Sequence, residues 1–328
     1  MTVAVHPPTI TSGSAGELID VQVCSVSPAA DATNLYELAR ADGAPLPPAE
    51  PGAHIDVHLP NGMMRQYSLV IPHANPSSYT LGIKRDANSR GCSRYIFNDL
   101  KAGRALTISA PRNHFPLAAG APFHVLIAGG IGITPIYAMT QKLSADGAAF
   151  ELHYAGRSRR QLAFRDELAN TEFARLHCDD EHGGALLDLA GVIARAPQGS
   201  HFYCCGPTPM LEAFRAATAA IPQEQVHFEY FSPKEEASKA GGFAVQLARS
   251  NLEVFIPPGQ SILETLREAG LTLDSSCQEG ICGVCETKVI SGIPDHRDAV
   301  LSDLEHAANK SMMICCSGCK GDRLVLDL

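Results

Sequence analysis

The sequence lacks the features that mark several large classes of protein. Lys and Arg number 26 against 35 Asp and Glu, which gives a formal charge of −9. That balance argues against nucleic acid as a main partner, because phosphate binding needs clustered cations. No apolar run approaches the ~20 residues of a membrane span, and residues 1–16 lack the basic and apolar stretches of a signal peptide. We therefore expect a cytoplasmic protein with a flexible N-terminal tail, no membrane partner and no nucleic-acid partner.

The eleven cysteines are unevenly distributed, and six of them lie between Cys277 and Cys319. The total is odd, and no export signal is found. Dense clustering in such a chain fits metal ligation in a reducing compartment better than a disulfide framework.

The length of 328 residues predicts two or three domains. Between residues 18 and 117, short apolar runs such as 55–59, 66–70 and 79–84 are separated by turn residues. This pattern of short apolar runs and turns predicts an antiparallel β-barrel.

The middle of the chain opens on a continuous apolar run, 123–128, of the kind that buried parallel strands show. Further strands are predicted at 150–154 and 201–205, and helices at 136–143 and 209–220. Alternating strands and helices predict βαβ units and an α/β domain with a parallel sheet.

The C-terminal part follows a polar, charged, Gly-terminated segment, 232–242, which predicts a linker. A charged surface helix is the alternative for this segment. Beyond it, 243–247 and 252–256 form a predicted hairpin. A helix should follow, capped at Ser261 by a Ser-x-x-Glu capping box and stopped at Gly270.

Three of the clustered cysteines, Cys277, Cys282 and Cys285, are spaced C-x4-C-x2-C. A cluster of two irons bridged by sulfide needs four thiolates, of which a tight loop can supply three. Gly280 and Gly283 allow backbone N–H groups of this loop to turn toward the sulfurs. The pattern predicts a [2Fe–2S] site. Zinc, the alternative, usually takes paired C-x2-C units, and this segment has one such unit.

The fourth ligand must return from a distant segment, where Cys315, Cys316 and Cys319 compete. The 29 residues between Cys285 and Cys315, and the Cys-x-Ser ending formed with Ser317, favour Cys315. The other two cysteines are then small, semi-buried side chains.

Residues 255–317 resemble a plant-type ferredoxin throughout. The match includes the segment 261–270 before the cluster loop and the loop itself, 274–285. The resemblance implies a β-grasp α+β domain whose [2Fe–2S] ligands are Cys277, Cys282, Cys285 and Cys315.

A flavin motif is present in Arg65-Gln66-Tyr67-Ser68, which matches the R-x-Y-S strand of the ferredoxin-reductase superfamily. Residues 83–85 and 90–93 resemble the segment that leads to a helix N-terminus under the flavin phosphate. Here Cys92 replaces the second Gly of the Gly-Gly-Ser pattern found in related reductases. By resemblance, the flavin-binding residues are Arg65, Gln66, Tyr67, Ser68, Ile83, Lys84, Gly91, Cys92, Ser93, Thr134 and Phe231.

A nucleotide motif is formed by the glycine-rich turn 128–135, which follows a predicted buried strand, and by the Cys-Gly-Pro element in 203–210. The resemblance implies that Ser68 approaches flavin N5 and that Cys205 lies beside the nicotinamide. Phe231 would cover the flavin, with Phe228 and Tyr230 as alternatives. By resemblance, the NAD-binding residues are Gly129, Gly130, Gly132, Thr134, Pro135, Arg157, Ser158, Cys205, Gly206, Pro207 and Met210.

The preference between NADH and NADPH stays open. Arg157, Arg159 and Arg160 follow the second predicted strand, and arginine there can accept a 2′-phosphate. The family resemblance points instead to NADH, which we expect to be the donor.

The order of flavin, nucleotide and ferredoxin domains resembles the phthalate dioxygenase reductase family. The resemblance includes Asp295-His296-Arg297-Asp298 and the terminal residues 324–328. It implies that NADH gives hydride to FMN, and that electrons pass singly through the [2Fe–2S] cluster to a Rieske-type aromatic-ring oxygenase, either a dioxygenase or an O-demethylase. We expect a monomer with a tail at 1–16, an FMN-binding barrel at 17–118, an NAD-binding domain at 119–231, a linker at 232–242 and a ferredoxin domain at 243–328.

Two other functions remain as alternatives. One is a reductase for a diiron monooxygenase, and the other is a non-enzymatic redox sensor or cluster carrier. From Gly241 onward the chain has seven Lys or Arg and twelve Asp or Glu, hence −5 of the total −9. This charge predicts that the ferredoxin domain docks on a basic face of its partner.

Overall fold

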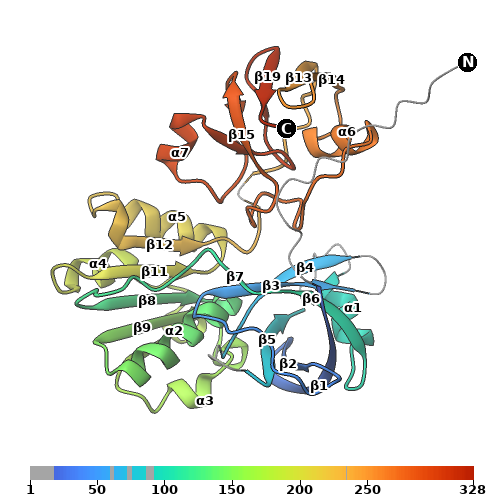
Figure 1. Cartoon of the computed structure of the whole chain (residues 1–328). Helices are drawn as coiled ribbons and strands as arrows, with labels where there is room; N and C mark the ends of the chain where they lie inside the picture. Colours follow the sequence, from blue (N-terminus) through green and yellow to red (C-terminus); the bar gives the residue numbers. More distant parts are fainter. Residues whose placement is uncertain (1–17, 60–62, 72–75, 86–91, 234) are drawn as a thin grey trace, which may run out of the picture. The chain divides into compact units, whose positions relative to one another are not determined.

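The computed structural model describes residues 18–59, 63–71, 76–85, 92–233 and 235–328 (Figure 1). The chain divides into two compact units, Glu17–Phe231 and Ser232–Leu328. Within the described ranges, no helix is both long enough and apolar enough to cross a membrane.

Seven antiparallel strands form the first sheet, in the order β4-β3-β6-β1-β2-β5, with β7 paired to β3. Leu69 bridges Leu81, and Val70 N donates to Thr80 O, so the two edge strands meet and the sheet closes. The predicted antiparallel barrel is therefore confirmed. Its strands are β1 (Leu18–Ala30), β2 (Thr33–Ala39), β3 (Ala53–His58), β4 (Met64–Ser68), β5 (Ser78–Lys84), β6 (Ala105–Ser109) and β7 (Arg112–Asn113).

Alternating side chains fill the barrel. In β1, Ile19, Val21 and Val23 are buried while the residues between them are exposed, which is the period of two expected of a half-buried strand. Helix α1 (Cys92–Asp99) adds Cys92 and Ile96 to the same core. The start of this helix is thereby held against the barrel interior.

The second sheet is parallel throughout, with strand order β10-β9-β8-β11-β12, as predicted. All six residues of the central strand β8 are buried, which explains its continuous apolar sequence. The strands are β8 (His124–Gly129), β9 (Phe150–Gly156), β10 (Ala174–Cys178), β11 (His201–Cys205) and β12 (Val226–Glu229).

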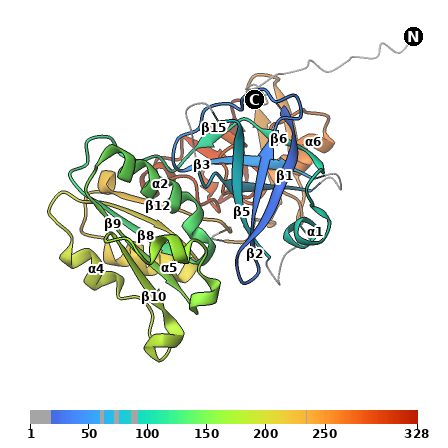
Figure 2. The same cartoon turned by 90° about the horizontal axis from the view of Figure 1, so that it is seen from below.

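Helices cover both faces of the parallel sheet. In Figure 1, α2 (Ile133–Asp146) and α3 (Arg165–Leu168) lie on one side, with α4 (Leu189–Arg195) and α5 (Thr208–Ala217) on the other. Both views show the barrel and the parallel sheet side by side within this unit (Figures 1 and 2). Helix α2 is longer than the predicted 136–143 because the Gly-rich turn leads directly into it, and it ends at Gly147 with φ 65°.

The C-terminal unit is a mixed sheet with the order β14-β13-β19-β15-β17, in which β13 and β19 are parallel. A short pair of strands, β16 and β18, stands beside it, and α6 packs against β14. This arrangement is the predicted β-grasp. Its elements are β13 (Phe243–Leu247), β14 (Leu252–Ile256), α6 (Ile262–Glu268), β15 (Glu286–Ser291), β16 (Pro294–Asp295), α7 (Asp303–Ala308), β17 (Ser311–Met313), β18 (Gly318–Cys319) and β19 (Arg323–Leu326).

Local predictions in this unit are confirmed where they depend on short patterns. The hairpin strands have the predicted bounds, and Ser261 forms the predicted capping box with Glu264. Gly270 follows α6 at φ 92°, a conformation that other residues rarely adopt. The described residues of the 232–242 segment contain no helix or strand, so they do not form the alternative surface helix.

Candidate functional site

The two turns predicted to bind NADH lie in direct contact. A Cβ on Gly132 would lie 2.1 Å from the carbonyl oxygen of Cys205. A Cβ on Gly129 would lie 2.7 Å from both Met210 Sδ and Pro207 Cδ. Both turns follow the carboxyl ends of β8 and β11, which pair in parallel. Glycine is required at these positions because any side chain would force the turns apart.

Helix α2 offers an anion-binding end at the same place. Its N-cap is Gly132, and no side chain of the described residues caps it. Gly130, at φ 54°, has open space where a Cβ would stand. Pro135 is buried in the first turn, and Gly206 lies against Gly129. The positive end of the α2 dipole, beside this glycine-rich turn, suits the pyrophosphate of a dinucleotide.

Thr134 lies where the barrel meets the nucleotide turn. A Cβ on Gly82 of β5 would lie 2.6 Å from Thr134 Cγ2. The Thr134 hydroxyl donates to Ile131 O at 3.1 Å, so it is held within the turn. This position borders both predicted cofactor sites.

The R-x-Y-S strand contacts the beginning of α1. Tyr67 Oη and Cys92 Sγ are 4.0 Å apart, and burial raises the pKa of Tyr67 well above its ordinary value. Burial also raises the pKa of Cys92, against the opposing effect of Arg65. Cys92 fills core space with its side chain, and Ser93 beside it is buried.

The other predicted flavin residues have different environments. Ser68 is buried opposite His54 on β3. Gln66 Nε2 donates to an aspartate of β3 at 3.0 Å. Ile83 lies in the barrel core, so only its backbone can reach a ligand, whereas Lys84 is exposed. Gly91 lies outside the described residues.

Glu229 was not predicted to belong to this site. The parallel register of β11 and β12 pairs it with Cys205. The residue is only partly buried, but its Oε2 is fully buried and finds no hydrogen-bond partner among the described residues. Burial raises the pKa of Glu229 to about 8. Burial, and then the nearby Glu229, raise the pKa of Cys205 well above its ordinary value, so both groups are mainly neutral at pH 7.

Three aromatic residues lie next to Glu229 in the sequence, and they differ in how far their side chains are exposed. Phe228 packs edge-on against Tyr230 at 5.7 Å and lies under the Arg215 guanidinium. Tyr230 is 6% exposed, whereas Phe231 is 38% exposed. Phe231 is therefore the ring with most surface available for stacking.

The loop after β9 carries Arg157 and Ser158, as predicted. Arg159 forms an ion pair with Glu181, with Nη2 and Oε2 3.1 Å apart. Arg160 Nε lies 3.7 Å from a carboxylate of the loop between β1 and β2. Two of the three arginines thus already face carboxylates, which weakens the argument for a 2′-phosphate.

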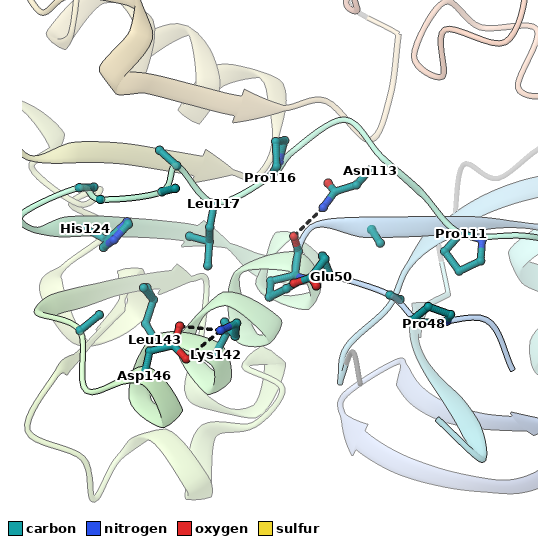
Figure 3. Close-up of a pocket in the computed structure, with 18 of the residues that line it drawn as sticks. Pro48, Glu50, Pro111, Asn113, Pro116, Leu117, His124, Lys142, Leu143 and Asp146 are labelled. Carbon is teal, nitrogen blue, oxygen red and sulfur yellow. Dashed lines mark hydrogen bonds and ion pairs between the residues drawn. The ribbon is translucent and has the colours of Figure 1, made fainter. Parts of the chain in front are cut away.

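A cavity of about 690 Å³ lies elsewhere, between the barrel and the parallel sheet (Figure 3). Its lining includes Pro48, Leu117 and His124, and the Lys142–Asp146 ion pair stands at one side. His124 begins β8, while the glycine-rich turn follows its other end. Because ligands of open parallel sheets bind at the carboxyl ends of the strands, this cavity is not the nucleotide site.

Sheet pairing brings the cysteine loop of the C-terminal unit to the distant fourth cysteine. Glu286 of β15 pairs with Met313 of β17, and Ile314 N donates to Cys285 O. Cys315 follows directly, so the two strands present Cys285 and Cys315 at one end of their ladder. The four predicted ligands are at most 6% exposed: Cys277, Cys282, Cys285 and Cys315.

The backbone of the loop turns its N–H groups toward sulfur. Cys277 Sγ accepts from Glu279 N at 3.3 Å and from Ile281 N at 3.4 Å. Gly280 and Gly283 have φ of 70° and 74°, which makes this curvature available without strain. Such N–H···S bonds stabilise thiolate ligands.

The surroundings of the sulfurs distinguish Cys315 from Cys316. The thiols of Cys282 and Cys315 act in opposite directions on the pKa of Cys277, which rises to about 11. Cys316 Sγ instead lies 3.8 Å from Met313 O and against Gly280, where a Cβ would stand 2.5 Å from it. The donor set of four buried thiols with N–H donors fits a [2Fe–2S] cluster, with Cys316 packing behind the loop.

A barrel that contacts a parallel-sheet domain at its glycine-rich turn, together with a β-grasp unit that offers a set of four buried thiols to a cluster, defines the class of flavin- and iron–sulfur-dependent electron-transfer reductases. The sequence model of the 2Fe-2S iron-sulfur cluster binding domain matches residues 245–320. The N-terminal domain of dimethylamine monooxygenase subunit DmmA-like proteins matches residues 108–226.

Relatives extend this match over nearly the whole chain. It is 47% identical over 311 residues to phenoxybenzoate dioxygenase subunit beta of Ectopseudomonas oleovorans, covering 94% of this chain and 97% of the relative. It is 48% identical over 318 residues to tetrachlorobenzoquinone reductase of Sphingobium chlorophenolicum, covering 94% and 98%. The solved structure of phthalate dioxygenase reductase aligns with a TM-score of 0.72 at 39% identity, covering 95% of this chain and 98% of that one. The chain belongs to the phthalate dioxygenase reductase family.

Proposed function

We propose that this protein passes electrons from NADH through FMN to its [2Fe–2S] cluster and then to a Rieske-type terminal oxygenase. The observation that carries the proposal is the presence in one chain of both the contacting nucleotide turns and four buried thiols. A cluster carrier or redox sensor alone would not need the first site. Absence of NADH-driven reduction of cytochrome c by the loaded protein would refute the proposal.

The residues of the first unit bind and orient the nucleotide. The N-terminus of α2 would hold the pyrophosphate, and Gly130 would leave room for it. Cys205 and Glu229 stand at the nicotinamide end. Both are neutral at pH 7, so they place no fixed negative charge beside the reacting ring.

The barrel holds the flavin beside that end. Tyr67 would pack along the ring, Ser68 would stand near its reactive edge, and Ser93 at the start of α1 would bind the phosphate. Phe231 would cover the exposed face until nicotinamide replaces it. Bound flavin supplies the conversion between a two-electron hydride donor and a one-electron acceptor.

The cofactor assignment has a direct test. Flavin released by denaturation should be FMN and not FAD, in a ratio of one per chain. NADH should reduce the protein at lower concentration than NADPH, because Arg159 and Arg160 face carboxylates. Equal affinity for the two nucleotides would refute this choice.

The partner is proposed from charge. The segment from Gly241 onward has a net charge of −5, which suits a basic docking face on an oxygenase. Coupled turnover with a Rieske oxygenase should fall as salt rises, while NADH reduction of ferricyanide should not. Salt-independent coupling would argue against electrostatic docking, and failure to couple with any Rieske oxygenase would favour a diiron partner.

A second function deserves a test because one relative is a tetrachlorobenzoquinone reductase. Quinones accept electrons one or two at a time, so a small molecule would replace the oxygenase. NADH oxidation with a halogenated benzoquinone as sole acceptor would support this function. The comparison should use rates at equal acceptor concentration, with and without a Rieske oxygenase.

The domain layout is part of the same proposal. The barrel is assigned to 17–118, the nucleotide domain to 119–231, the linker to 232–242 and the ferredoxin domain to 243–328. We place the protein in the cytoplasm as a monomer, because its buried free thiols suit a reducing compartment that supplies NADH. Gel filtration of the loaded protein tests the oligomeric state.

A further inference from the structure

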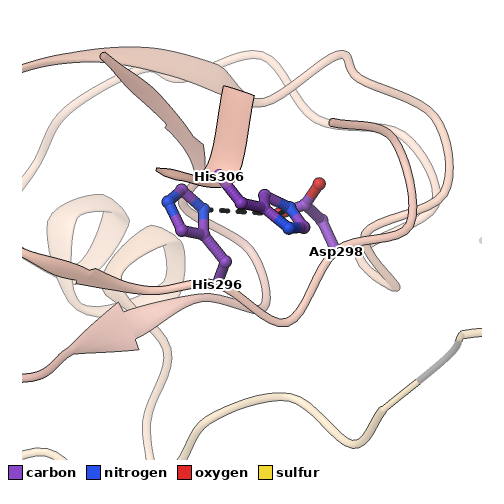
Figure 4. Close-up of side chains that lie close together, drawn as sticks. All are labelled: His296, Asp298 and His306. Carbon is purple, nitrogen blue, oxygen red and sulfur yellow. Dashed lines mark hydrogen bonds and ion pairs between the residues drawn. The ribbon is translucent and has the colours of Figure 1, made fainter. Parts of the chain in front are cut away.

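Two histidines and an aspartate of the C-terminal unit converge outside the cysteine loop (Figure 4). His296 and Asp298 lie in the segment after β16, and His306 lies on α7. Their nearest ligand atoms all lie within 4.8 Å of one another. The imidazole rings stack with centroids 4.4 Å apart, beside the carboxylate.

The carboxylate of Asp298 is held in one orientation. Its side chain is fully buried, and Oδ2 accepts from Leu301 N at 2.9 Å and from Val300 N at 3.2 Å. Oδ1 then faces the two rings, at 3.2 Å from His306 Nε2 and 3.7 Å from His296 Nδ1. A buried carboxylate therefore presents one oxygen to two imidazoles.

The second nitrogen of His296 reveals an unpaired acceptor. His296 Nε2 lies 3.3 Å from Asn309 Oδ1, and Asn309 Nδ2 donates to Ala307 O at 3.2 Å, which identifies the amide oxygen. Nε2 therefore carries a proton, and in the neutral imidazole Nδ1 presents a lone pair. Nδ1 is buried with no hydrogen-bond partner among the described residues, and the side chain is 8% exposed. Two acceptors, Nδ1 and the carboxylate oxygen of Asp298, face each other across 3.7 Å.

A cation between these atoms would resolve the conflict. We propose that His296 Nδ1, Asp298 Oδ1 and His306 Nε2 bind a divalent zinc ion. Zinc takes such N and O ligands at about 2.0–2.2 Å in a tetrahedron, which separates ligand atoms by about 3.4 Å. The observed separations of 3.2 and 3.7 Å bracket that value. His306 is 23% exposed, so the ion has an entry side and room for water as a fourth ligand.

The outer contacts match those of metal sites. Two of the three ligands are oriented by a second partner: Asn309 holds His296, and the amides of Val300 and Leu301 hold Asp298. Asn309 itself ends α7 in a left-handed conformation, at φ 50°. Ala299 N donates to Gly280 O at 2.8 Å, so the site braces the cysteine loop. The ion would tie α7 to the segment that supports the [2Fe–2S] cluster.

The test uses the full-length protein with its cluster and flavin in place. The protein is treated with EDTA, checked for an unchanged visible spectrum, incubated with Zn²⁺ and desalted. Elemental analysis should find one zinc per chain in addition to the cluster iron. Zinc-edge X-ray absorption should show only nitrogen and oxygen neighbours.

Variants H306A and D298N should each lower zinc affinity at least tenfold while the cluster spectrum persists. H306A removes a partly exposed ligand, and D298N keeps the shape of the buried side chain, so at least one should fold. Variant H182A is the matched control, because in the stacked pair of His177 and His182 each ring has one nitrogen bonded to a backbone carbonyl. It should retain zinc.

Three results would overturn the proposal. The first is no retained zinc in the wild-type protein. The second is zinc retained equally by wild type, H306A and D298N. The third is sulfur among the zinc neighbours, which would assign the metal to cysteines such as the partly exposed Cys319.

Discussion

The nucleotide turns of the first unit and the cysteine loop of the second both depend on glycine, but for different reasons. At Gly132 the requirement is steric, since the backbone of Cys205 occupies the place of a Cβ. At Gly280 and Gly283 it is also conformational, since both have positive φ. The first site is made by packing two strand ends together, and the second by bending one loop around sulfur.

This difference predicts how each site fails. A site made by packing is already formed without ligand, so its residues affect folding and binding together. A site made by a loop depends on its metal, because four buried thiols must lose protons and are stabilised as thiolates only when iron is bound. Substitutions in the loop should therefore abolish cluster binding before they unfold the sheet.

The largest expected effect is that of C282S. Loss of one of four thiolates should abolish the cluster, with iron content and the visible cluster bands falling to background. NADH reduction of cytochrome c should be lost, while NADH reduction of ferricyanide through the flavin persists. C316A is the control, because Cys316 packs behind the loop, and it should keep its iron. Full iron in C282S, or none in C316A, would reverse the ligand assignment.

Next in size is G132A. The added Cβ would meet backbone atoms at 2.1 and 2.4 Å, which cannot move without separating β8 from β11. We expect NADH to bind at least tenfold more weakly, about 1.4 kcal/mol, measured by titration of the loaded protein. G321A adds a Cβ into open space and should leave NADH affinity unchanged. Normal affinity in G132A would show that the turns are not rigidly packed.

A smaller effect concerns Glu229, whose pKa is raised from 4.5 to about 8 by burial. The folded protein keeps a proton that the unfolded chain releases above pH 4.5. The protonation of Glu229 therefore contributes fully to the free energy of unfolding below pH 4.5, and this contribution is lost as the pH rises toward 8. E229Q cannot ionise, so its melting temperature relative to wild type should rise between pH 5 and 8. A constant difference across that range would contradict a buried, protonated Glu229.

The smallest expected effect is on helix capping in the C-terminal unit. S261A removes the cap of α6, which packs buried residues into the core, and should lower stability by about 1 kcal/mol in urea unfolding. S302A removes the matching capping box from α7, which buries none of its residues, and should cost less. A larger loss of stability in S302A than in S261A would mean that α7 contributes more to the stability of the domain than its packing indicates.

Prediction from sequence succeeded where the signal was local. The C-x4-C-x2-C loop and the Ser261 capping box occupy a few consecutive residues, so their geometry follows from short-range chemistry. Glu229 was missed because its position depends on the register of β12 beside β11, which no short pattern encodes. The grouping of His296 with His306 was missed similarly, since α7 carries one of them back across the intervening residues.

The contact between Gly82 and Thr134 has a consequence for protein engineering. A methyl group of the nucleotide domain rests where a barrel residue has no side chain, so the two partners must be inherited as a matched pair. A chimera that exchanges the barrel alone would have to bring a glycine at this point or accept a smaller residue in place of Thr134. The C-terminal unit has its own sheet and core, so it is the more suitable module to exchange between reductases.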